Sequence, residues 1–64
     1  ADRMGLVAAR DLQPGDVVDR GAVRFAFPAL GIPVEAWDEV AGRRLRDGVG
    51  RDEPLLPEHL LPLD

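Results

Sequence analysis

Apolar residues occur along this chain in short runs separated by turn-forming residues, a pattern that predicts small strands instead of long helices. Residues 4–9, MGLVAA, predict a buried or edge strand, and residues 17–18 predict a second, very short one. A further strand is predicted at Val23–Phe25, where two apolar side chains share one face and Arg24 points to the other. The fold class is therefore expected to be mainly β, with much of the chain in irregular structure.

The turns between these runs have identifiable chemistry. Pro14 presets φ and Gly15 supplies a positive φ, which together predict a type II turn. Asp19 is placed to cap a single helical turn through residues 20–22. Pro57 is expected to begin another one-turn helix, in which His59 would have a surface or capping role.

The stretch Gly31–Arg46 contains the only Trp of the chain and has the marks of a short helix. Pro33 suits the first helical position, apolar residues recur at helical spacing around Trp37, and Gly42 suits a left-handed residue after the helix end. We therefore expect one or two helical turns that press Trp37 into the core, followed by an Arg-rich strand.

The two ends of the chain repeat each other at a shift of 37 positions (49 minus 12). The shift superposes four pairs: Leu12 on Val49, Asp16 on Glu53, Val18 on Leu55, and Val23 on Leu60. Each half then reads as strand, acidic turn, apolar pair, helical turn and apolar residue. This repeat predicts a pseudo-two-fold unit in which each half covers the apolar side of the other.

The apolar positions of these predicted elements should form one hydrophobic core. The expected members are Leu6, Val7, Leu12, Val18, Val23, Ile32, Trp37, Val40, Leu45, Val49, Leu55 and Leu60. A single domain of 64 residues lies near the lower size limit for independent folding, so further stabilisation is expected from Pro-stiffened loops or from packing on a larger partner.

Composition excludes several function classes. The net charge of −4 argues against a phosphate-backbone binder, so no nucleic-acid partner is expected. No apolar run is long enough to cross a membrane and no signal peptide is visible, so we expect a cytoplasmic protein without a membrane partner. One His and no Cys exclude the usual zinc patterns, and no metal site is expected.

No catalytic residue is predicted. The chain has no Ser, Thr, Cys, Lys or Tyr, so the ordinary nucleophiles are missing. Its paired carboxylates are neighbours in sequence and are expected to be solvated turn charge: Asp38, Glu39, Asp52 and Glu53. The arginines from Arg43 to Arg51 are expected on a solvated face interleaved with Asp47 and Asp52.

Three motifs carry a family resemblance over nearly the whole chain. They are residues 6–12 with Pro14-Gly15-Asp16, then Gly31-Ile32-Pro33 with Trp37-Asp38-Glu39-Val40 and Gly42-Arg43, and finally Asp52-Glu53-Pro54-Leu55 with Glu58-His59-Leu60. This pattern resembles the SAF (antifreeze-like) domain at the C-terminal end of sialic acid synthases, whose fold is shared by fish type III antifreeze proteins. The resemblance implies a β-clip of short strands and single helical turns, with residues 1–64 forming one SAF domain of a longer enzyme.

The resemblance also implies a function. A sialic acid synthase condenses phosphoenolpyruvate with an N-acetylated amino sugar on a catalytic barrel, which would hold the divalent metal. The SAF domain would need no cofactor of its own and would supply a lid, a dimer interface and an Arg contact to the amino sugar. Its partner would be the barrel of the same or a partner subunit, and the isolated domain would not be catalytic.

Arg24 is the candidate for that substrate contact. In the family, an Arg on the segment before the Gly-Ile-Pro region reaches into the barrel of the other subunit, and Arg24 is the only Arg between Gly21 and Arg43. The family usually follows this Arg with Pro-Gly, where this chain has Phe25-Ala26. From the residues alone, the alternative is a strand Arg that faces solvent and pairs with a carboxylate.

Two other functions remain open. A stand-alone ice-binding protein would use the first turn and the strand after it, but Arg10, Asp11 and Asp16 make that region strongly hydrated. The other alternative is that the chain is an SAF module of a pilus or flagellar assembly protein, because such modules resemble it too. The Trp37–Val40 motif with Gly42 favours the synthase branch.

Overall fold

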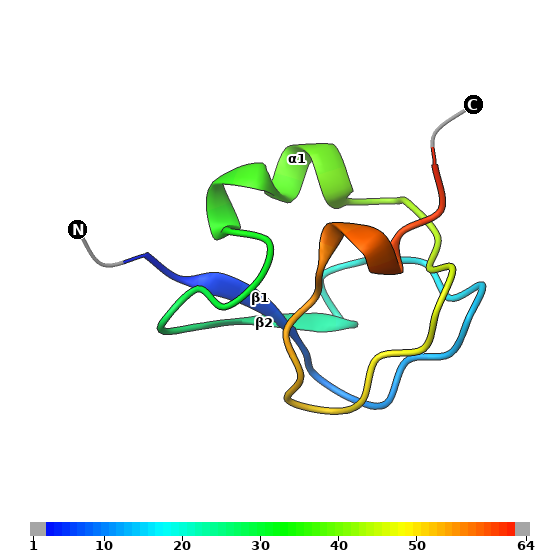
Figure 1. The fold of residues 1–64 in the computed structure, drawn as a ribbon, viewed down its shortest axis with the longest axis horizontal. Helices are drawn as coiled ribbons and strands as arrows, with labels where there is room; N and C mark the ends of the chain where they lie inside the picture. Colours follow the sequence, from blue (N-terminus) through cyan, green and yellow to red (C-terminus); the bar gives the residue numbers. More distant parts are fainter. Residues whose placement is uncertain (1–2, 63–64) are drawn as a thin grey trace.

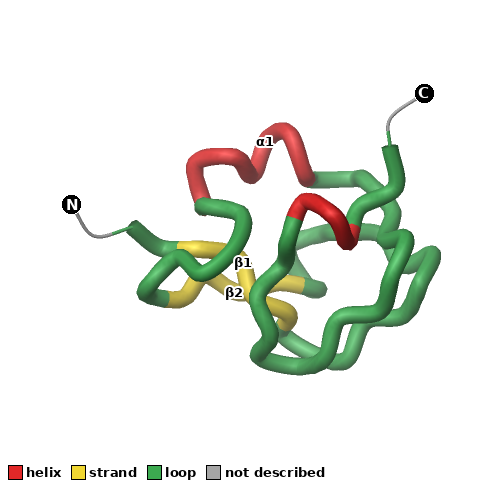
Figure 2. Tube along the Cα trace, viewed as in Figure 1, coloured by secondary structure: helices red, strands yellow, loops and turns green. Residues whose placement is uncertain are grey.

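A computed structural model describes residues 3–62 of the chain, and its regular structure is sparse. Strand β1 (Gly5–Ala8) pairs antiparallel with strand β2 (Val23–Ala26), with Gly5 opposite Ala26 and Ala8 opposite Val23. Figure 2 shows that most of the remaining chain is loop. The expected small, β-rich and largely irregular structure is confirmed.

The middle of the chain forms two consecutive helical turns, as predicted. The 3₁₀ turn η1 (Val34–Ala36) runs directly into the one-turn helix α1 (Trp37–Val40). Pro33 was predicted at the first helical position but lies at the N-cap, so the helical turn begins one residue later, at Val34. Gly42 has the expected left-handed backbone, with φ +86°. A third turn, η2 (Pro57–His59), begins at Pro57 as predicted. Figure 1 shows all three turns on the same side of the β1–β2 pair.

Isolated β-bridges tie the loops together where longer strands were predicted. Val17 pairs with Arg44, and Leu45 pairs with Leu60, so the expected strand at residues 17–18 and the Arg-rich strand are single bridges. Figure 1 shows the corresponding loops, coloured blue to cyan and yellow, running side by side. Because the elements are too short to form continuous ladders, the backbone N–H and C=O groups of these loops form single hydrogen bonds with distant segments.

The predicted internal repeat is present in the backbone hydrogen bonds. Leu12 and Val49, which the 37-residue shift relates, pair with each other: each N–H donates to the other's carbonyl oxygen, at 2.8 and 3.0 Å. Val18 N–H donates to Arg43 O, and the shifted pair, Leu55 N–H to Leu6 O, is also formed. Equivalent positions of the two halves therefore make equivalent backbone hydrogen bonds.

One hydrophobic core is built by residues of both halves and of the segment between them. Eleven of the twelve predicted members are buried, and two small residues that were not predicted, Ala8 and Ala22, are buried with them. Trp37 is the exception: it is half-buried and packs against the outside of the core. The prediction that Trp37 is pressed into the core is therefore wrong. A one-turn helix at the surface presents only one residue, Val40, to the interior.

Gly31 marks a close approach between the middle segment and the second half. Ile32 N–H donates to Leu55 O at 2.8 Å, and a Cβ at position 31 would lie 2.1 Å from that same oxygen. Any side chain at position 31 would therefore separate the two backbones. Within residues 3–62, no helix is long and apolar enough to span a bilayer.

Candidate functional site

Arg24 extends from β2 on the side opposite to the core. Its side chain is half exposed, and Nη2 donates a hydrogen bond to Oδ1 of Asp52 at 2.7 Å. This is the carboxylate-paired strand Arg that the residues alone suggested. The guanidinium remains accessible, because among residues 3–62 the pairing uses only one of its nitrogens.

The partner of Arg24 belongs to the tight turn Gly50–Glu53. Asp52 has φ +69°, a left-handed conformation that residues other than Gly adopt at a cost. Its N–H donates to Ala8 O at 2.8 Å, and Ala8 N–H donates to Glu53 O at 2.9 Å. These bonds fasten the turn to the end of β1, which is paired with the strand that carries Arg24.

The environment of Asp52 favours its ionised form. The hydrogen bond from Arg24 lowers the pKa of the Asp52 carboxyl below its ordinary value, against a smaller opposing effect of desolvation. The positive charges of Arg24 and Arg51 lower this pKa further. Asp52 is therefore a stable anion at neutral pH.

Arg51 contributes through its backbone as well as its charge. Arg51 N–H donates to Oδ1 of Asp11 at 2.8 Å, which links the second turn to the loop after β1. The turn that carries Asp52 is thus held on two sides, by Asp11 and by Ala8. Sequence analysis did not predict this link, because Asp11 and Arg51 are forty residues apart.

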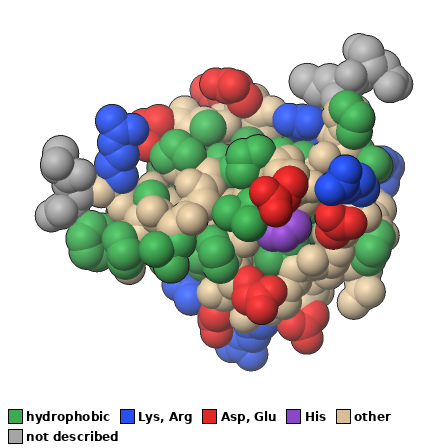
Figure 3. Space-filling view, viewed as in Figure 1, with side chains coloured by type: hydrophobic (Ala, Val, Ile, Leu, Met, Phe, Trp, Pro, Cys, Tyr) green, Lys and Arg blue, Asp and Glu red, His purple; other side chains and the backbone are tan. Residues whose placement is uncertain are grey.

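The other predicted charges have local structural partners. Glu53 accepts a hydrogen bond from Gly50 N–H, while Arg46 pairs with Asp47, so these residues are turn and surface charge as predicted. The Nδ1 atom of His59 accepts a hydrogen bond from Leu56 N–H at 3.0 Å, which confirms its capping role. Figure 3 shows acidic and basic side chains distributed over the visible face without a basic patch.

Arg20 has a role that sequence analysis missed. Its guanidinium lies 4.2 Å from the centre of the Phe25 ring and 5.9 Å from that of Trp37. Cation–π contacts of this kind keep a charged group over an aromatic surface. The charge therefore covers the half-buried Trp37, and no sequence signal connects position 20 with position 37.

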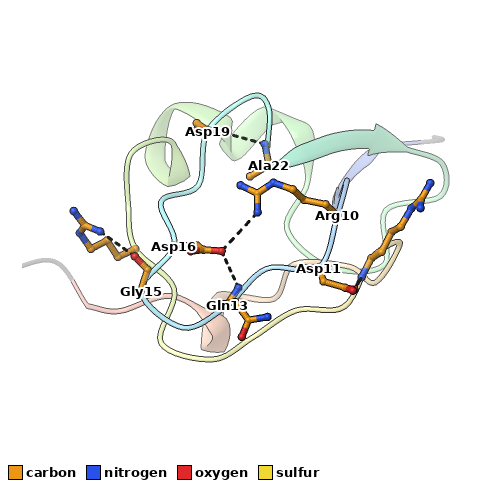
Figure 4. Close-up of polar contacts among 9 residues, drawn as sticks. Arg10, Asp11, Gln13, Gly15, Asp16, Asp19 and Ala22 are labelled. Carbon is orange, nitrogen blue, oxygen red and sulfur yellow. Dashed lines mark hydrogen bonds and ion pairs between the residues drawn. The ribbon is translucent and has the colours of Figure 1, made fainter.

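The first turn is surrounded by charged and polar contacts, which Figure 4 shows in close-up. Asp16 accepts a hydrogen bond from Gln13 N–H at 2.8 Å and lies 3.7 Å from the guanidinium of Arg10. Asp19 accepts a bond from Ala22 N–H at 2.9 Å, so the predicted capping contact is present, although residues 20–22 form a turn and not a helix.

A shallow cavity of about 260 Å³ lies between α1 and η2. Its walls are mainly apolar, with Glu39 and Arg43 as the charged members, and Arg24 does not line it. The described residues, 3–62, contain no cluster of three or more potential metal ligands. Arg24 is therefore a surface group that lies outside this cavity.

Comparison with protein families decides the classification. The SAF domain family matches residues 3–61, nearly the whole chain. The chain belongs to the SAF domain family. Comparison with curated protein sequences gives no significant match.

The SAF domain also has a similar solved structure. It is similar to a protein assigned as spore coat polysaccharide biosynthesis protein E from Chromobacterium violaceum, with a TM-score of 0.83 and 24% sequence identity. The match covers 94% of this chain and 18% of that protein. The chain therefore spans less than a fifth of the length of this relative, and the likeness shows a shared fold.

Proposed function

We propose that this SAF domain is the substrate-binding, lid and dimerisation domain of a sialic acid synthase-like enzyme. Such an enzyme condenses phosphoenolpyruvate with an N-acetylated amino sugar, a carbon–carbon bond-forming transfer. The family membership and the fold shared with a polysaccharide biosynthesis protein support this proposal. We further propose that the fold is the β-clip of this family, which the paired backbone contacts of the two halves support.

The observation that carries the proposal is the accessibility of Arg24. Its guanidinium is half exposed and uses one nitrogen for Asp52, which leaves further N–H donors for the amide and hydroxyl oxygens of an amino sugar. Because the chain lacks the ordinary nucleophiles and its described part has no metal cluster, the chemistry would take place on a catalytic barrel. That barrel would hold the divalent metal and phosphoenolpyruvate, and the protein would be cytoplasmic.

Exposed apolar side chains support contact with such a barrel. Phe27 and Leu30 follow β2 and are 61% and 71% exposed, and Met4, directly before β1, is 45% exposed. Ala29 N–H donates to Arg3 O at 2.9 Å, which brings this loop beside the N-terminal segment. Grouped exposed apolar residues are typical of interaction surfaces. We propose that this surface meets the barrel of the same or a partner subunit.

The proposal is tested by steady-state kinetics of the full-length enzyme. We expect Arg24→Ala to raise the KM for the amino sugar about 10- to 100-fold, the loss expected for one or two hydrogen bonds from a charged group. The KM for phosphoenolpyruvate should barely change. Arg46→Ala is the matched control, because Arg46 is similarly exposed and paired with Asp47. Unchanged amino-sugar kinetics in Arg24→Ala would rule out the substrate contact.

Ice binding is the alternative function, because the fold expected for this family is shared by fish antifreeze proteins. The region around the first turn contains Arg10, Asp11 and Asp16 in ionic and hydrogen-bonded contacts, and ordered ice offers no comparable hydration for such charges. We expect no thermal hysteresis above that of a control protein of equal size. A clear hysteresis would favour the ice-binding function instead.

A further inference from the structure

We infer that Asp52 is a positioning residue that holds the guanidinium of Arg24 in the direction required for the amino sugar. This inference rests on the proposed function of Arg24. It starts from the contact itself, in which Oδ1 of Asp52 accepts a hydrogen bond from Nη2 at 2.7 Å. A guanidinium is a rigid plane, so fixing one nitrogen also restricts the directions of the remaining N–H groups.

The internal repeat shows that Asp52 is not required by the turn. The 37-residue shift relates Asp52 to Gly15, and both residues have a positive φ, +69° and +91°. Both also make the same backbone bond: Asp52 N–H donates to Ala8 O and Gly15 N–H donates to Leu45 O, each at 2.8 Å. The same backbone geometry is therefore built with Gly in one half and with Asp in the other.

Stability does not explain the choice of Asp at this position. A left-handed backbone is easier for Gly than for Asp, and an exposed ion pair contributes little to the free energy of unfolding. The side chains of Asp52 and Arg24 are 61% and 50% exposed. The shift also relates Arg24 to Leu61, so the repeat-related positions, Leu61 and Gly15, have no equivalent ion pair. The departure from the repeat coincides with the candidate substrate contact.

The anchoring of Asp52 suits a positioning role. Ala8 at the end of β1 bonds to both Asp52 and Glu53, and β1 pairs with the strand that carries Arg24. The carboxylate and the guanidinium are therefore held by the same small sheet. Any motion of this sheet moves both groups together, which keeps the free donors of Arg24 at a constant angle to the domain.

The test compares Asp52→Gly, Asp52→Asn and the control Asp47→Asn in the full-length enzyme. The probes are phosphoenolpyruvate and the best-used member of a panel of N-acetylated hexosamines. We expect Asp52→Gly to raise the amino-sugar KM about 3- to 10-fold, with kcat and the phosphoenolpyruvate KM nearly unchanged. Its melting temperature should be equal to or above that of the wild type, because Gly suits the left-handed backbone. Asp52→Asn should have a smaller effect on KM, and Asp47→Asn none.

A double-mutant cycle with Arg24→Ala separates the possible outcomes. If Asp52 acts through Arg24, Asp52→Gly adds no further rise in KM when Arg24 is already Ala. An equal rise in that background, or an unchanged KM in Asp52→Gly alone, overturns the positioning role while the function of Arg24 stands. If Arg24→Ala itself has no effect, or no hexosamine is condensed, the proposed function fails and the positioning role fails with it.

Discussion

The two tight turns of this SAF domain, Gln13–Asp16 and Gly50–Glu53, have the same frame and different chemistry. In each, the N–H of the first residue donates to the carboxylate of the last, at 2.8 Å from Gln13 to Asp16 and at 3.0 Å from Gly50 to Glu53. In each, the N–H of the fourth residue donates back to the carbonyl oxygen of the first, at 3.0 Å. At none of the four positions is the residue type shared, and the positive-φ third position holds Gly15 in one turn and Asp52 in the other.

This difference separates structural from functional requirements. The repeated backbone contacts and the shared core are present in both halves, so they are what the fold needs. The pair of Arg24 and Asp52 joins the two halves and has no counterpart in the repeat, because the related positions hold Leu61 and Gly15. It leaves a charged donor accessible. Departures from an internal repeat therefore indicate which residues to test for function.

The largest expected effect tests whether the two halves share the core. Leu55 and its counterpart Val18 are both fully buried. We expect Leu55→Ala to lower the free energy of unfolding by about 2–5 kcal/mol, comparable to the roughly 3–5 kcal/mol that such a small core supplies. Val18→Ala removes fewer atoms and should cost less. Urea denaturation followed by circular dichroism measures both; a loss below about 1 kcal/mol for Leu55→Ala would contradict the shared core.

The next effect concerns the segment that belongs to neither half. Trp37 is half-buried and covered by Arg20, so Trp37→Ala should cost about 2 kcal/mol, less than the roughly 3–5 kcal/mol of a fully buried aromatic residue. The same denaturation experiment measures it. If Trp37→Ala lowered the free energy of unfolding more than Leu55→Ala does, Trp37 would be a core residue, which would contradict its half-buried position.

A smaller effect distinguishes the two turns directly. Gly15 has φ +91°, and a Cβ added at this position would meet no other atom within 4 Å, so Gly15→Ala changes backbone strain without a clash. We expect a loss of about 1–2 kcal/mol in the free energy of unfolding, the cost of a left-handed conformation for an L-residue. Gly21→Ala is the control, because Gly21 is exposed and has no positive φ. Equal stability of the two variants would show that the first turn tolerates a side chain.

The smallest effect is a change in titration. Asp52 has a lowered pKa in the folded protein because Arg24 donates to it, so its ion pair stabilises the fold above the unfolded-state pKa. This contribution is lost as the pH falls through the lowered value. We expect Arg24→Gln to raise the pKa of Asp52 toward its ordinary range, measured by ¹³C NMR of the carboxyl carbon. An unchanged pKa in Arg24→Gln would mean that the ion pair is not formed in solution.

Local chemistry made the turns, the helical turns and most of the core predictable. Pro14 with Gly15, Asp19 and Pro57 each act on their own neighbours, and the apolar runs between them account for eleven of the twelve expected core residues. The exposure of Trp37 was not predictable in this way. Helical spacing placed it on an apolar face, but only the packing of α1 shows that Val40 takes the buried position.

The candidate site was only half visible in the sequence. Arg24 could be singled out from its position in an otherwise apolar strand and from the family resemblance. Its partner Asp52 was assigned to solvated turn charge, because the two residues are 28 positions apart and nothing local connects them.

The sequence determined the elements whose causes lie within a few residues, and the 37-residue repeat determined that two such sets would face each other. Only the tertiary structure decided which side chains meet across that arrangement. Arg20 over Trp37, Asp11 on Arg51, and Asp52 on Arg24 all join distant segments. The geometry of these contacts depends on how the short bridged loops pack around the core. Each bridge is formed by backbone N–H and C=O groups, which every residue type except Pro carries, so the residue types do not specify which groups pair.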